Sequence, residues 1–553
     1  MQTLHLPVGA PPGCSASERL ILIKMRGPRP SPPAADCEAA VRAAVARLFG
    51  AGVQPRGAQL AAAAAALRGD DALLVAPTGF GKSMCYQALP EAARVLREGR
   101  GEHEGVLGGG HFSRAVVVCV TPLLALSADQ ARSCEEKGLS VARWDSTIGR
   151  DKLARTAREL VEFAEEEEAA GSPCDVLFAT PEALAGSAEL RQALRALSAS
   201  DRILALAVDE AHCVAEWGHD FRPAYLSLRG LREGAQQGGA CLAAETPVLA
   251  LTATATKDVE WQLRECLGLR RSHCLVERVD LNRPNHGYEV FHKEDLRGDD
   301  SGDADANAAA MAHLARFVAE QQANGAAGIV YARRRADVER LAGQLEDAPG
   351  VELVEGYHAG MSEERRAAIL RDFVGGEAVC VVATVAFGMG IDRADVRFVA
   401  HFDLPGAASL YQMFGRAGRD GQPAVCRVYV SSKDIDETEK LVKAGGGAEA
   451  EAAATFVGRR VRCRRAALLA HFGEYRACAE CDTRCDMCLA RAAGGSGARP
   501  SAETAALRPL PQQEAVPQQQ PRSAVRKPPV YAPQPPGHLK RRRRAFVPPR
   551  RMD

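Results

Sequence analysis

Short runs of consecutive apolar residues alternate with stretches of helical periodicity between Leu73 and Leu251. Runs of this length suit strands that are buried on both faces of a parallel sheet. The helical stretches between them would supply the crossover connections. The pattern therefore predicts an α/β domain with a doubly wound parallel sheet. Its expected strands lie in the segments DALLVAP, AVVVCVTP, DVLFATP, ILALAVDE and VLALTATAT.

The same alternation returns after about residue 282, in GIVYA, VELVEGYHA, AVCVVAT and VRFVAHFD, and predicts a second α/β domain. From Asp436 the pattern becomes helical and ends in clustered cysteines. Both ends of the chain lack a sustained period and are rich in Pro with Gly and Ala or with Gln, which predicts disorder. The predicted parts are a disordered N-terminus (1–37), a first α/β domain (38–279), a second (280–435), a helical module (436–492) and a disordered basic tail (493–553).

Composition narrows the class of protein. Of 553 residues, 46% are hydrophobic and 25% charged, as in globular proteins with a full core. No run of 18 apolar residues or secretory signal is present, so we expect neither a membrane span nor export. The formal net charge of +0 hides a basic tail, because residues 501–553 hold eleven Lys and Arg but three Asp and Glu. Its KRRRR run (540–544) predicts nucleic-acid phosphate or a nuclear import receptor as partner, with a solvated charge run as the alternative.

A glycine-rich turn, LLVAPTGFGKS, follows the first predicted strand and precedes a helix-like stretch. Successive backbone N–H groups and a helix N-terminus form a cradle for phosphate groups. In such a loop a lysine reaches the β- and γ-phosphates and a hydroxyl residue holds Mg²⁺. The usual first glycine of the pattern is Ala76 here, and a chance glycine-rich turn is the alternative. The candidate phosphate and Mg²⁺ residues are Thr78, Gly79, Gly81, Lys82 and Ser83.

An acidic pair, Asp209 and Glu210, ends the predicted strand ILALAV. Ligands gather at the carboxyl ends of strands in open α/β sheets. In P-loop nucleotide hydrolases one such acid helps to hold Mg²⁺, and a second carboxylate orients the attacking water. The pair therefore predicts a hydrolytic site together with Lys82, and a solvated acidic turn is the alternative.

Two arginines, Arg416 and Arg419, lie in the glycine-rich segment QMFGRAGRDG of the second predicted domain. Side chains three residues apart on a helix share one face, so we expect both to point into one cleft. There they could neutralise the charge that develops on a γ-phosphate. Hydrolysis would then require the two domains to close. A pair of surface arginines is the alternative.

Five cysteines cluster near residue 480, and four thiolates suit tetrahedral Zn²⁺. Without a secretion signal, a metal site fits the pattern better than disulfides. Free buried thiols are the alternative. A metal module without a core of its own should unfold when it loses the ion. The five are Cys463, Cys478, Cys481, Cys485 and Cys488.

An ordered set of segments resembles the motif series of superfamily 2 helicases: APTGFGKS, TPLLALSADQ, FATPEAL, DEAH, LTATAT, YHAGM, VATVAFGMGID and QMFGRAGRDG. The segments WGHDFRPAY and DLNRPNHGYEV and the cysteine cluster resemble the RecQ family of DNA helicases in particular. The resemblance covers roughly residues 40–490. It implies two tandem RecA-like P-loop domains, whose parallel sheets are flanked by helices, a small helical zinc-binding module and disordered termini.

The resemblance also implies roles for individual residues. It departs from the family's usual pattern at Pro55 and Arg56, where an aromatic-Arg pair is common, and at Phe80, where a small residue is usual in the loop. The family's cysteine pattern matches Cys463, Cys481, Cys485 and Cys488 and leaves Cys478 as a spare or as an alternate to Cys481. The residues with implied roles in ATP binding are Arg56, Gln59 and Gln412, and those in coupling hydrolysis to DNA are Thr252 and Thr254.

An unusual aromatic cluster follows the acidic pair. Its members resemble a loop of the family that contacts single-stranded DNA, and aromatic rings with a basic side chain suit stacking on bases. Packing in the core is the alternative for the aromatic residues. The candidate DNA-binding residues are Trp217, His219, Phe221 and Arg222.

The resemblance implies an ATP-dependent DNA helicase that moves 3′ to 5′ on single-stranded DNA and unwinds duplex DNA. Its implied cofactors are ATP, Mg²⁺ and Zn²⁺, and its implied partners are single-stranded and forked or branched DNA. Recombination, repair and replication in the nucleus are the implied processes. An RNA helicase and a nucleic-acid-binding scaffold with little unwinding are the alternatives. Since no winged-helix or C-terminal helical domain follows the cysteines, we expect a short form with weak unwinding and strand annealing.

Overall fold

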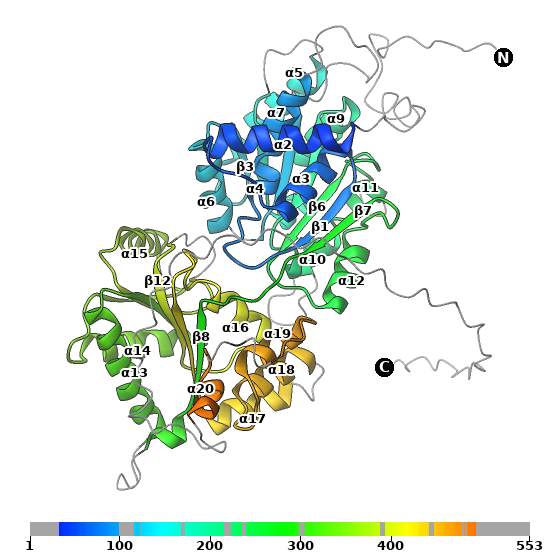
Figure 1. Cartoon of the computed structure of the whole chain (residues 1–553). Coiled ribbons are helices and arrows are strands. Elements are labelled where there is room, and N and C mark those ends of the chain that lie inside the picture. Colours follow the sequence, from blue (N-terminus) through cyan, green and yellow to red (C-terminus); the bar gives the residue numbers. More distant parts are fainter. Residues whose placement is uncertain are drawn as a thin grey trace, which may run out of the picture. The chain divides into compact units, whose positions relative to one another are not determined.

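The computed structural model describes residues 32–98, 115–122, 124–166, 172–214, 223–234, 239–297, 305–387, 393–441, 447–477, 481 and 484–493. They form two β-sheets with flanking helices and a helical segment that carries the cysteines (Figure 1). We call residues 34–278 the first lobe, residues 286–430 the second lobe and residues 432–492 the cysteine module.

The sheet of the first lobe has seven strands in the order β3-β4-β2-β5-β6-β1-β7, and all its pairings are parallel. Parallel pairing places the carboxyl ends of β1, β5 and β6 on the same side of the sheet, where the strands end. The strands are β1 (Asp71–Val75), β2 (Val116–Val120), β3 (Val141–Trp144), β4 (Val176–Ala179), β5 (Ile203–Val208), β6 (Val248–Thr252) and β7 (Cys274–Arg278).

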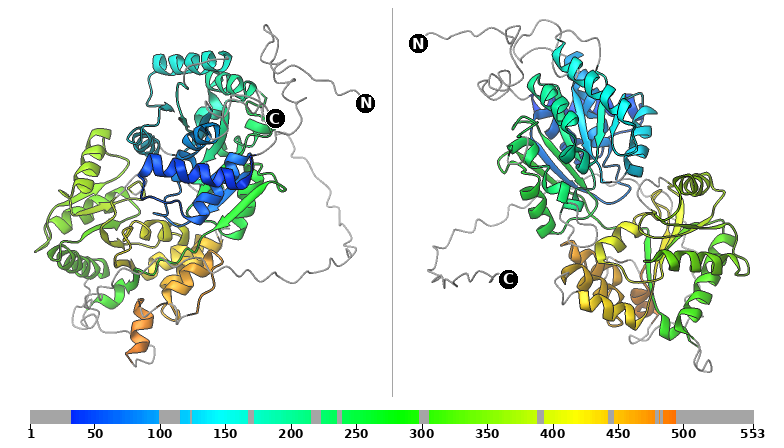
Figure 2. Two further views of the ribbon diagram at one scale, coloured as in Figure 1. Left: turned by 45° about the horizontal axis from the view of Figure 1, so that its top comes forward. Right: turned by 180° about the vertical axis from the view of Figure 1, so that it is seen from behind.

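Helices cover both faces of this sheet (Figure 1, Figure 2). Successive residues of β1 show this, because Ala72 and Leu74 belong to one buried cluster and Leu73 and Val75 to another. The helices of the first lobe are α2 (Ala34–Phe49), α3 (Gly57–Arg68), α4 (Met84–Gln87), α5 (Leu89–Glu98), α6 (Leu124–Glu135), α7 (Arg150–Glu165), α8 (Pro181–Gly186), α9 (Ala188–Ala199), η2 (Ala211–Val214), α10 (Pro223–Leu226), α11 (Gly230–Glu233) and α12 (Lys257–Cys266).

The sheet of the second lobe has six strands in the order β10-β11-β9-β12-β13-β8, again with parallel pairings. Its strands are β8 (His286–His292), β9 (Ala327–Tyr331), β10 (Val354–Tyr357), β11 (Cys380–Ala383), β12 (Val396–His401) and β13 (Ala424–Val430). Its helices are η3 (Lys293–Leu296), α13 (Ala306–Ala323), α14 (Arg335–Glu346), α15 (Glu363–Gly375) and α16 (Ala407–Phe414).

The cysteine module shares its core with the second lobe. Phe456 and Leu468 of the module lie in one buried cluster with Ile329 and Val399 of the sheet. The module therefore depends on the second lobe for much of its apolar burial. Its helices are α17 (Ser432–Leu441), α18 (Gly447–Val457), α19 (Arg464–His471) and α20 (Asp486–Ala492).

The predicted fold class is confirmed, since both lobes are parallel α/β layers and each predicted apolar run contains a strand. One predicted boundary is wrong. Helix α2 begins at Ala34, so the last residues of the segment 1–37 are helical and not disordered. Alanine-rich sequence directly after Pro33, with Asp36 in the first turn, favours a helix start there. The other domain boundaries remain predictions.

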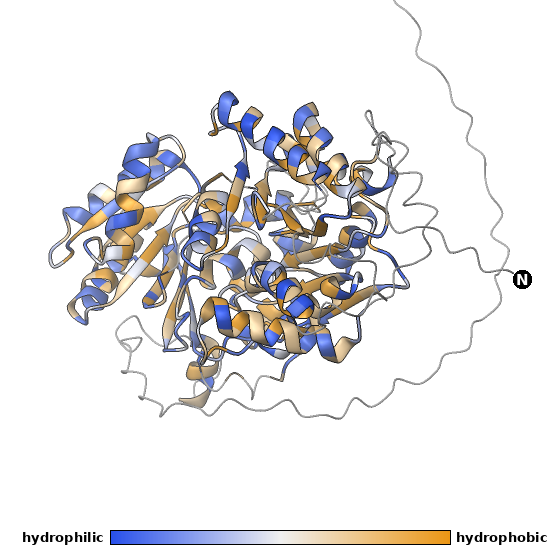
Figure 3. Cartoon of the chain, turned by 90° about the horizontal axis from the view of Figure 1, so that it is seen from above, coloured by the Kyte–Doolittle hydropathy of each residue, from blue (hydrophilic) through white to orange (hydrophobic). Residues whose placement is uncertain are grey.

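Four strands escaped the sequence pattern, namely β3, β7, β8 and β13. β3 and β7 lie at the two edges of their sheet and are mostly half-buried, so they lack a continuous apolar run. β13 is fully buried but contains Arg427, whose Nη2 donates to Glu289 on β8 at 2.6 Å. In Figure 3 the strands are mostly coloured as hydrophobic, whereas the helices carry many hydrophilic segments.

Candidate functional site

The glycine-rich loop lies directly after β1, at the carboxyl edge of the first sheet. Gly79 and Gly81 have φ angles of +81° and +82°, which side chains rarely adopt. A Cβ atom on Gly81 would also lie 2.9 Å from Nε2 of Gln59. The loop leads into the short helix α4, so backbone N–H groups and a helix start come together as the sequence predicted. Thr78, Lys82 and Ser83 lie in the same loop.

Lys82 bends back over this loop. Its Nζ donates to the carbonyl oxygens of Ala76 at 3.0 Å and Pro77 at 3.4 Å. Burial lowers the pKa of the Lys82 ammonium, and the negative charges of Glu210 and Asp209 oppose that shift. The structure thus places Lys82 within electrostatic range of the acidic pair, although 126 residues separate the two motifs.

Asp209 and Glu210 follow the carboxyl end of β5. The backbone N–H of Glu210 donates to Oδ1 of Asp209 at 3.0 Å, and Glu210 has a φ of +48°, which is strained for a residue other than glycine. Burial raises the pKa of Asp209 to about 7, and the Glu210 carboxylate adds to the shift. Two neighbouring carboxyl groups, Asp209 buried and Glu210 half-buried, gain from a nearby cation, which Mg²⁺ or a lysine can supply.

A hydrogen-bonded chain joins the acidic pair to the second lobe. Nδ1 of His212 lies 3.0 Å from Oγ1 of Thr252 and 3.4 Å from Oε2 of Glu210. The Thr252 hydroxyl donates to the carbonyl oxygen of Thr254 at 3.0 Å. Nε2 of Gln412 lies 2.9 Å from Nε2 of His212 and donates to Oγ1 of Thr254 at 3.3 Å. The predicted coupling threonines and Gln412 are therefore brought together through His212, for which no role was predicted.

Arg416 and Arg419 also approach the loop, but not as predicted. Helix α16 ends at Phe414, and the segment after it forms turns with a φ of +57° at Gly418, so the arginines do not share a helix face. Glycines at positions 415, 418 and 421 explain why the helix stops there. The side chain of Arg419 nevertheless lies beside Gly79, where its Cγ is 3.4 Å from the position that an added Cβ would take. Both arginines lower the pKa of Lys82, as nearby positive charges do.

Arg283 connects the two lobes at the same place. Its Nη1 donates to the carbonyl oxygen of Thr78 in the glycine-rich loop at 2.9 Å. Its Nη2 donates to the carbonyl oxygens of Gly418 at 2.9 Å and Ala417 at 3.2 Å. No role was predicted for Arg283, because its partners are backbone atoms more than a hundred residues away in the sequence. The segment DLNRPNHGYEV, which carries it, was the available signal.

Arg56 and Gln59 lie beside the loop, at the start of α3. Gln59 is 3% exposed, and its Nε2 donates to the carbonyl oxygens of Phe80 and Gly81, both at 2.9 Å. Its Oε1 accepts from the backbone N–H of Arg56 at 2.7 Å. The Arg56 guanidinium lies over the Phe80 ring, 4.7 Å from its centroid. A pocket of about 130 Å³ opens between Arg56 and Phe80 on one side and Arg283, Asn285 and Arg419 on the other.

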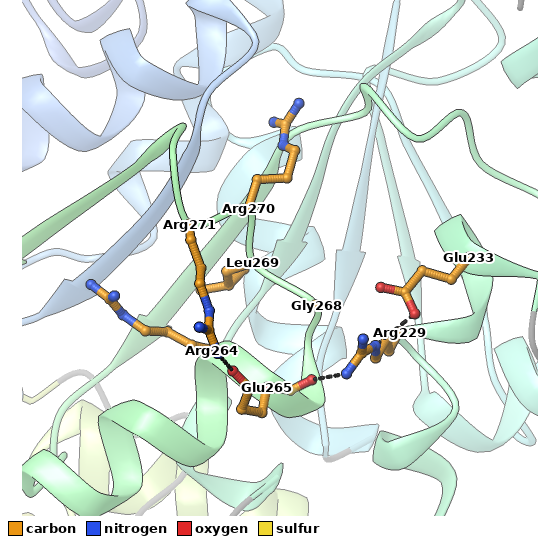
Figure 4. A pocket seen from close by; sticks show the side chains of 8 residues that line it. All are labelled: Arg229, Glu233, Arg264, Glu265, Gly268, Leu269, Arg270 and Arg271. Carbon is orange, nitrogen blue, oxygen red and sulfur yellow. Dashed lines mark hydrogen bonds and ion pairs between the residues drawn. The ribbon is translucent and has the colours of Figure 1, made fainter. Parts of the chain in front are cut away.

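A second pocket, of about 340 Å³, lies near the amino ends of β1 and β7, away from the glycine-rich loop (Figure 4). Its charged groups pair with one another: Arg229 Nε donates to Glu233 at 2.6 Å, and Arg271 Nη2 donates to Glu265 at 2.8 Å. Arg270 is held by Asp71, which is fully buried at the start of β1. These arginines serve internal ion pairs, so the phosphate-loop pocket is the better candidate site.

The cysteine cluster has the arrangement of a metal centre. The sulfur atoms of four buried cysteines lie within 4.8 Å of one another. Thiolates bound to Zn²⁺ at about 2.3 Å in a tetrahedron lie roughly 3.8 Å apart, so a small contraction would fit the ion. The four are Cys463, Cys481, Cys485 and Cys488.

The module also holds the segment that carries Arg283. Nη1 of Arg465 donates to the carbonyl oxygen of Arg283 at 2.6 Å and to Oδ1 of Asn282 at 2.7 Å. Its Nη2 donates to the carbonyl oxygen of His286 at 2.6 Å. Nη1 of Arg484 donates to the carbonyl oxygen of Pro284 at 3.0 Å. Side chains of the module therefore fix the backbone of residues 282–286.

Several predicted residues lie outside the part of the chain that the structure describes. They include the proposed DNA-binding residues, the alternate cysteine and the basic run of the tail: Trp217, His219, Phe221, Arg222, Cys478 and residues 540–544. Their roles remain predictions. Among the described residues, no helix is long and apolar enough to span a membrane.

Three family models match consecutive parts of the chain. They describe a DEAD/DEAH box helicase (residues 56–261), a helicase conserved C-terminal domain (309–421) and RecQ zinc-binding (429–489). The last range contains the four clustered cysteines. These matches and the cysteine cluster support ATP and Zn²⁺ as ligands.

Curated relatives are similar over most of this chain. The ATP-dependent DNA helicase hus2/rqh1 of Schizosaccharomyces pombe is 34% identical over 78% of this chain and 30% of its own length. The ATP-dependent DNA helicase Q5 of Rattus norvegicus is 33% identical over 84% and 45%, respectively. The ATP-dependent DNA helicase RecQ of Haemophilus influenzae is 32% identical over 77% and 60%. The chain thus spans between 30% and 60% of the length of these relatives.

Solved helicase structures share the fold. The Mycobacterium smegmatis helicase Lhr, bound to ssDNA and AMP-PNP, matches with a TM-score of 0.51 and 21% identity over 76% of this chain and 49% of its own. The DEAD-box helicase Mss116, bound to ssRNA and UDP-BeF, matches with a TM-score of 0.53 and 14% identity over 78% and 88%. At such identities the likeness shows the fold alone, which confirms two RecA-like lobes.

Proposed function

Because this chain belongs to the RecQ family of DNA helicases, we propose that it couples ATP hydrolysis to 3′-to-5′ movement on single-stranded DNA and to unwinding of duplex DNA. The observation that carries the proposal is the meeting of two sets of residues from different lobes. The glycine-rich loop and the acidic pair of the first lobe lie beside Arg283, Gln412 and Arg419 of the following segments. A site that is completed by both lobes can respond to their movement.

In the proposed reaction the loop and Lys82 bind the β- and γ-phosphates, while Ser83 and Asp209 hold Mg²⁺. The fit of a divalent cation is supported by the neighbouring carboxyl groups of Asp209 and Glu210, where burial raises the pKa of Asp209. Mg²⁺, when bound, neutralises phosphate charge. Glu210 orients the attacking water, as a carboxylate beside the metal ligand does in related hydrolases.

Arginines of the second lobe stabilise the charge that develops on the γ-phosphate. Arg419 lies beside Gly79, and the buried Nε of Arg416 has no hydrogen-bond partner among the described atoms. An unsatisfied buried donor costs free energy until an acceptor arrives. Phosphate oxygens are acceptors of the right charge, so this arginine is poised for them.

Coupling to DNA is proposed to pass through the loop that follows the acidic pair. This loop is proposed to stack on and pair with single-stranded DNA through Trp217, His219, Phe221 and Arg222. DNA contact would then move the side chains of Asp209 and Glu210, which precede the loop in the chain. Trp217→Ala and Arg222→Ala should therefore keep basal ATPase and lose its stimulation by DNA. Unchanged stimulation in both variants would return the loop to a packing role.

The test of the function compares ATPase and strand separation with single-stranded DNA or RNA as the activator, beside a Lys82→Ala control. DNA-stimulated ATPase that Lys82→Ala abolishes supports the proposal. Stimulation by RNA alone would overturn it in favour of an RNA helicase. Tight binding without ATPase would favour a scaffold.

Action on forked or branched DNA during recombination, repair and replication is part of the proposal and follows from the family. We place the protein in the nucleus, where the basic run at 540–544 would engage an import receptor. A fluorescent fusion that loses nuclear enrichment when these five residues are changed to alanine would support the location. Enrichment that is independent of them would refute the role of this run.

A further inference from the structure

Helix α16 of the second lobe begins without a capping side chain of its own. Its N-cap residue is Gly406, which has no side chain to accept a hydrogen bond from the first turn. The backbone N–H of Ala408 donates instead to Oε2 of Glu449 in the cysteine module, at 2.7 Å. A Cβ atom on Gly406 would lie 3.3 Å from the same oxygen, so the glycine leaves room for the carboxylate. Glu449 therefore caps α16 from a different part of the chain.

The Glu449 carboxylate is also held from a second side. Nε2 of His471, whose side chain is 4% exposed, lies 2.8 Å from Oε1 of Glu449. Burial would raise the pKa of the Glu449 carboxyl, but the hydrogen bond and charge of His471 and the N–H of Ala408 outweigh it and lower that pKa. Glu449 is therefore charged at neutral pH. A negative charge at the start of a helix interacts favourably with the helix dipole.

The cysteine module contacts the middle of α16 as well as its start. The ring of Phe472 packs against that of Tyr411, with 5.0 Å between the centroids. The residue after Tyr411 is Gln412, which bonds to His212 and Thr254 of the first lobe. The module thus supports the helix that completes the hydrogen-bonded chain to the acidic pair.

We propose that Glu449 is a positioning residue for ATP hydrolysis. Its carboxylate fixes the first turn of α16, and α16 presents Gln412 to the first lobe. Ala408 and Gln412 lie four residues apart on the same side of the helix, so a shift of the first turn moves Gln412 as well. A helix of eight residues is too short to be stable by itself, which makes the cap important. The inference rests on the proposed function and deepens it, because it gives the cysteine module a route to the hydrolytic site that does not pass through Arg283.

The test measures ATPase of the full chain with and without single-stranded DNA. Glu449→Ala should lower DNA-stimulated ATPase roughly fivefold, as expected for the loss of one helix cap, and should lower basal ATPase less. Glu449→Gln keeps an oxygen acceptor for Ala408 and should retain most of the activity. Glu451→Ala is the matched control, because this glutamate is exposed on the same helix α18, and both activities should be kept. Equal loss of basal and stimulated ATPase in Glu449→Ala, or the same loss in the control, would overturn the inference.

A new cap in the second lobe should rescue the Glu449→Ala variant. The φ angle of Gly406 is −61°, which any residue adopts, and a serine hydroxyl at an N-cap accepts from the first turn. Adding Gly406→Ser to Glu449→Ala should therefore restore DNA-stimulated ATPase. General damage to the cysteine module would not respond to a change at Gly406, so failure of the rescue would overturn the inference.

Two further measurements separate positioning from other roles. The double variant Glu449→Ala, Gln412→Ala should be no weaker than Gln412→Ala alone, because both changes act on one contact, and additive losses would contradict this. Amide hydrogen exchange of residues 407–414, which needs no hydrolysis, should rise in Glu449→Ala and fall back when Gly406→Ser is added. Unchanged exchange beside intact DNA-stimulated hydrolysis would refute only the inference. Faster exchange that Gly406→Ser reverses, in a chain without DNA-stimulated hydrolysis, would refute only the proposed function.

Discussion

Replacing Arg283 by alanine removes a side chain that joins the phosphate loop to residues 412–421 of the second lobe. We call these residues the arginine segment, because they carry Arg416 and Arg419. Its contact with the first lobe is the hydrogen bond from Nη1 of Arg283 to the carbonyl oxygen of Thr78, at 2.9 Å. The two bonds from Nη2, to the carbonyl oxygens of Ala417 and Gly418, hold the guanidinium against the second lobe. We expect Arg283→Ala to lower kcat for DNA-stimulated ATP hydrolysis and to leave KM for ATP little changed.

The magnitude follows from the single hydrogen bond that the Arg283 side chain makes to the first lobe. A hydrogen bond from a charged donor contributes about 1.5–3 kcal/mol, and about 1.4 kcal/mol corresponds to a factor of ten. The closed arrangement should therefore be about ten- to a hundredfold less populated, and kcat should fall by that factor. Since the Arg283 side chain is only partly buried, the lower end is the better expectation. KM stays similar because Arg283 binds the loop through a backbone carbonyl and is not among the proposed phosphate ligands.

Arg397→Ala is a matched control. Its Nη2 donates to Asp420 at 2.7 Å and its Nη1 to the carbonyl oxygen of Pro423 at 3.0 Å, so it supports the same arginine segment without reaching the phosphate loop. Steady-state ATPase at saturating single-stranded DNA, with thermal unfolding followed by circular dichroism, separates activity from folding. The reasoning is refuted if Arg283→Ala keeps its kcat, or if Arg397→Ala loses as much.

Three further substitutions test the cysteine cluster, the buried Asp71 of the first lobe and the hydrogen bonds of Gln412 to the first lobe. Cys485→Ser should abolish zinc binding, measured as bound metal per chain, and should lower the thermal stability of the module; full zinc occupancy would contradict the assignment. Burial alone would raise the pKa of Asp71, but the hydrogen bonds of Arg270 and the charge of Arg232 outweigh it and lower that pKa. The native state then binds fewer protons, so this stability is present above the unfolded pKa of about 3.9 and is lost as pH falls through the lower pKa of the folded state. Asp71→Asn should lower the free energy of unfolding by about 3–5 kcal/mol at neutral pH, measured by urea unfolding. No change would refute the pairing. Gln412→Ala should reduce DNA-stimulated ATPase more than basal ATPase, and an equal loss of both would argue against a coupling role.

The sequence predicted which residues the geometry of a parallel sheet brings together. Lys82 and Asp209 each follow a buried strand, and in such sheets the carboxyl ends of the strands share one edge. The nucleotide loop and the acids could therefore be placed together from apolar runs and two short motifs. The four cysteines could likewise be grouped, because three of them lie within eight residues.

What the sequence could not predict depends on contacts between distant backbone atoms. Arg283 binds carbonyl groups, and any residue provides a carbonyl, so no pattern marks its partners. The contact between Arg56 and Phe80 was not predicted either, because the two side chains meet only when α3 packs beside the loop. The expected helix at Arg416 failed for a local reason, because the glycines around it favour turns over a helix.

The cysteine module is linked to the nucleotide loop by one buried arginine. Arg465, two residues after Cys463, is 2% exposed and donates to the carbonyl oxygen of Arg283, whose own side chain reaches Thr78. Moving a buried guanidinium would leave its carbonyl partners unsatisfied, so the module fixes the backbone from which Arg283 extends. The cysteine module therefore helps to set the position of Arg283, in addition to completing the core of the second lobe. Changes at the cysteines and at Arg283 should then act on one contact, and their effects on hydrolysis should be less than additive, whereas changes at independent contacts add.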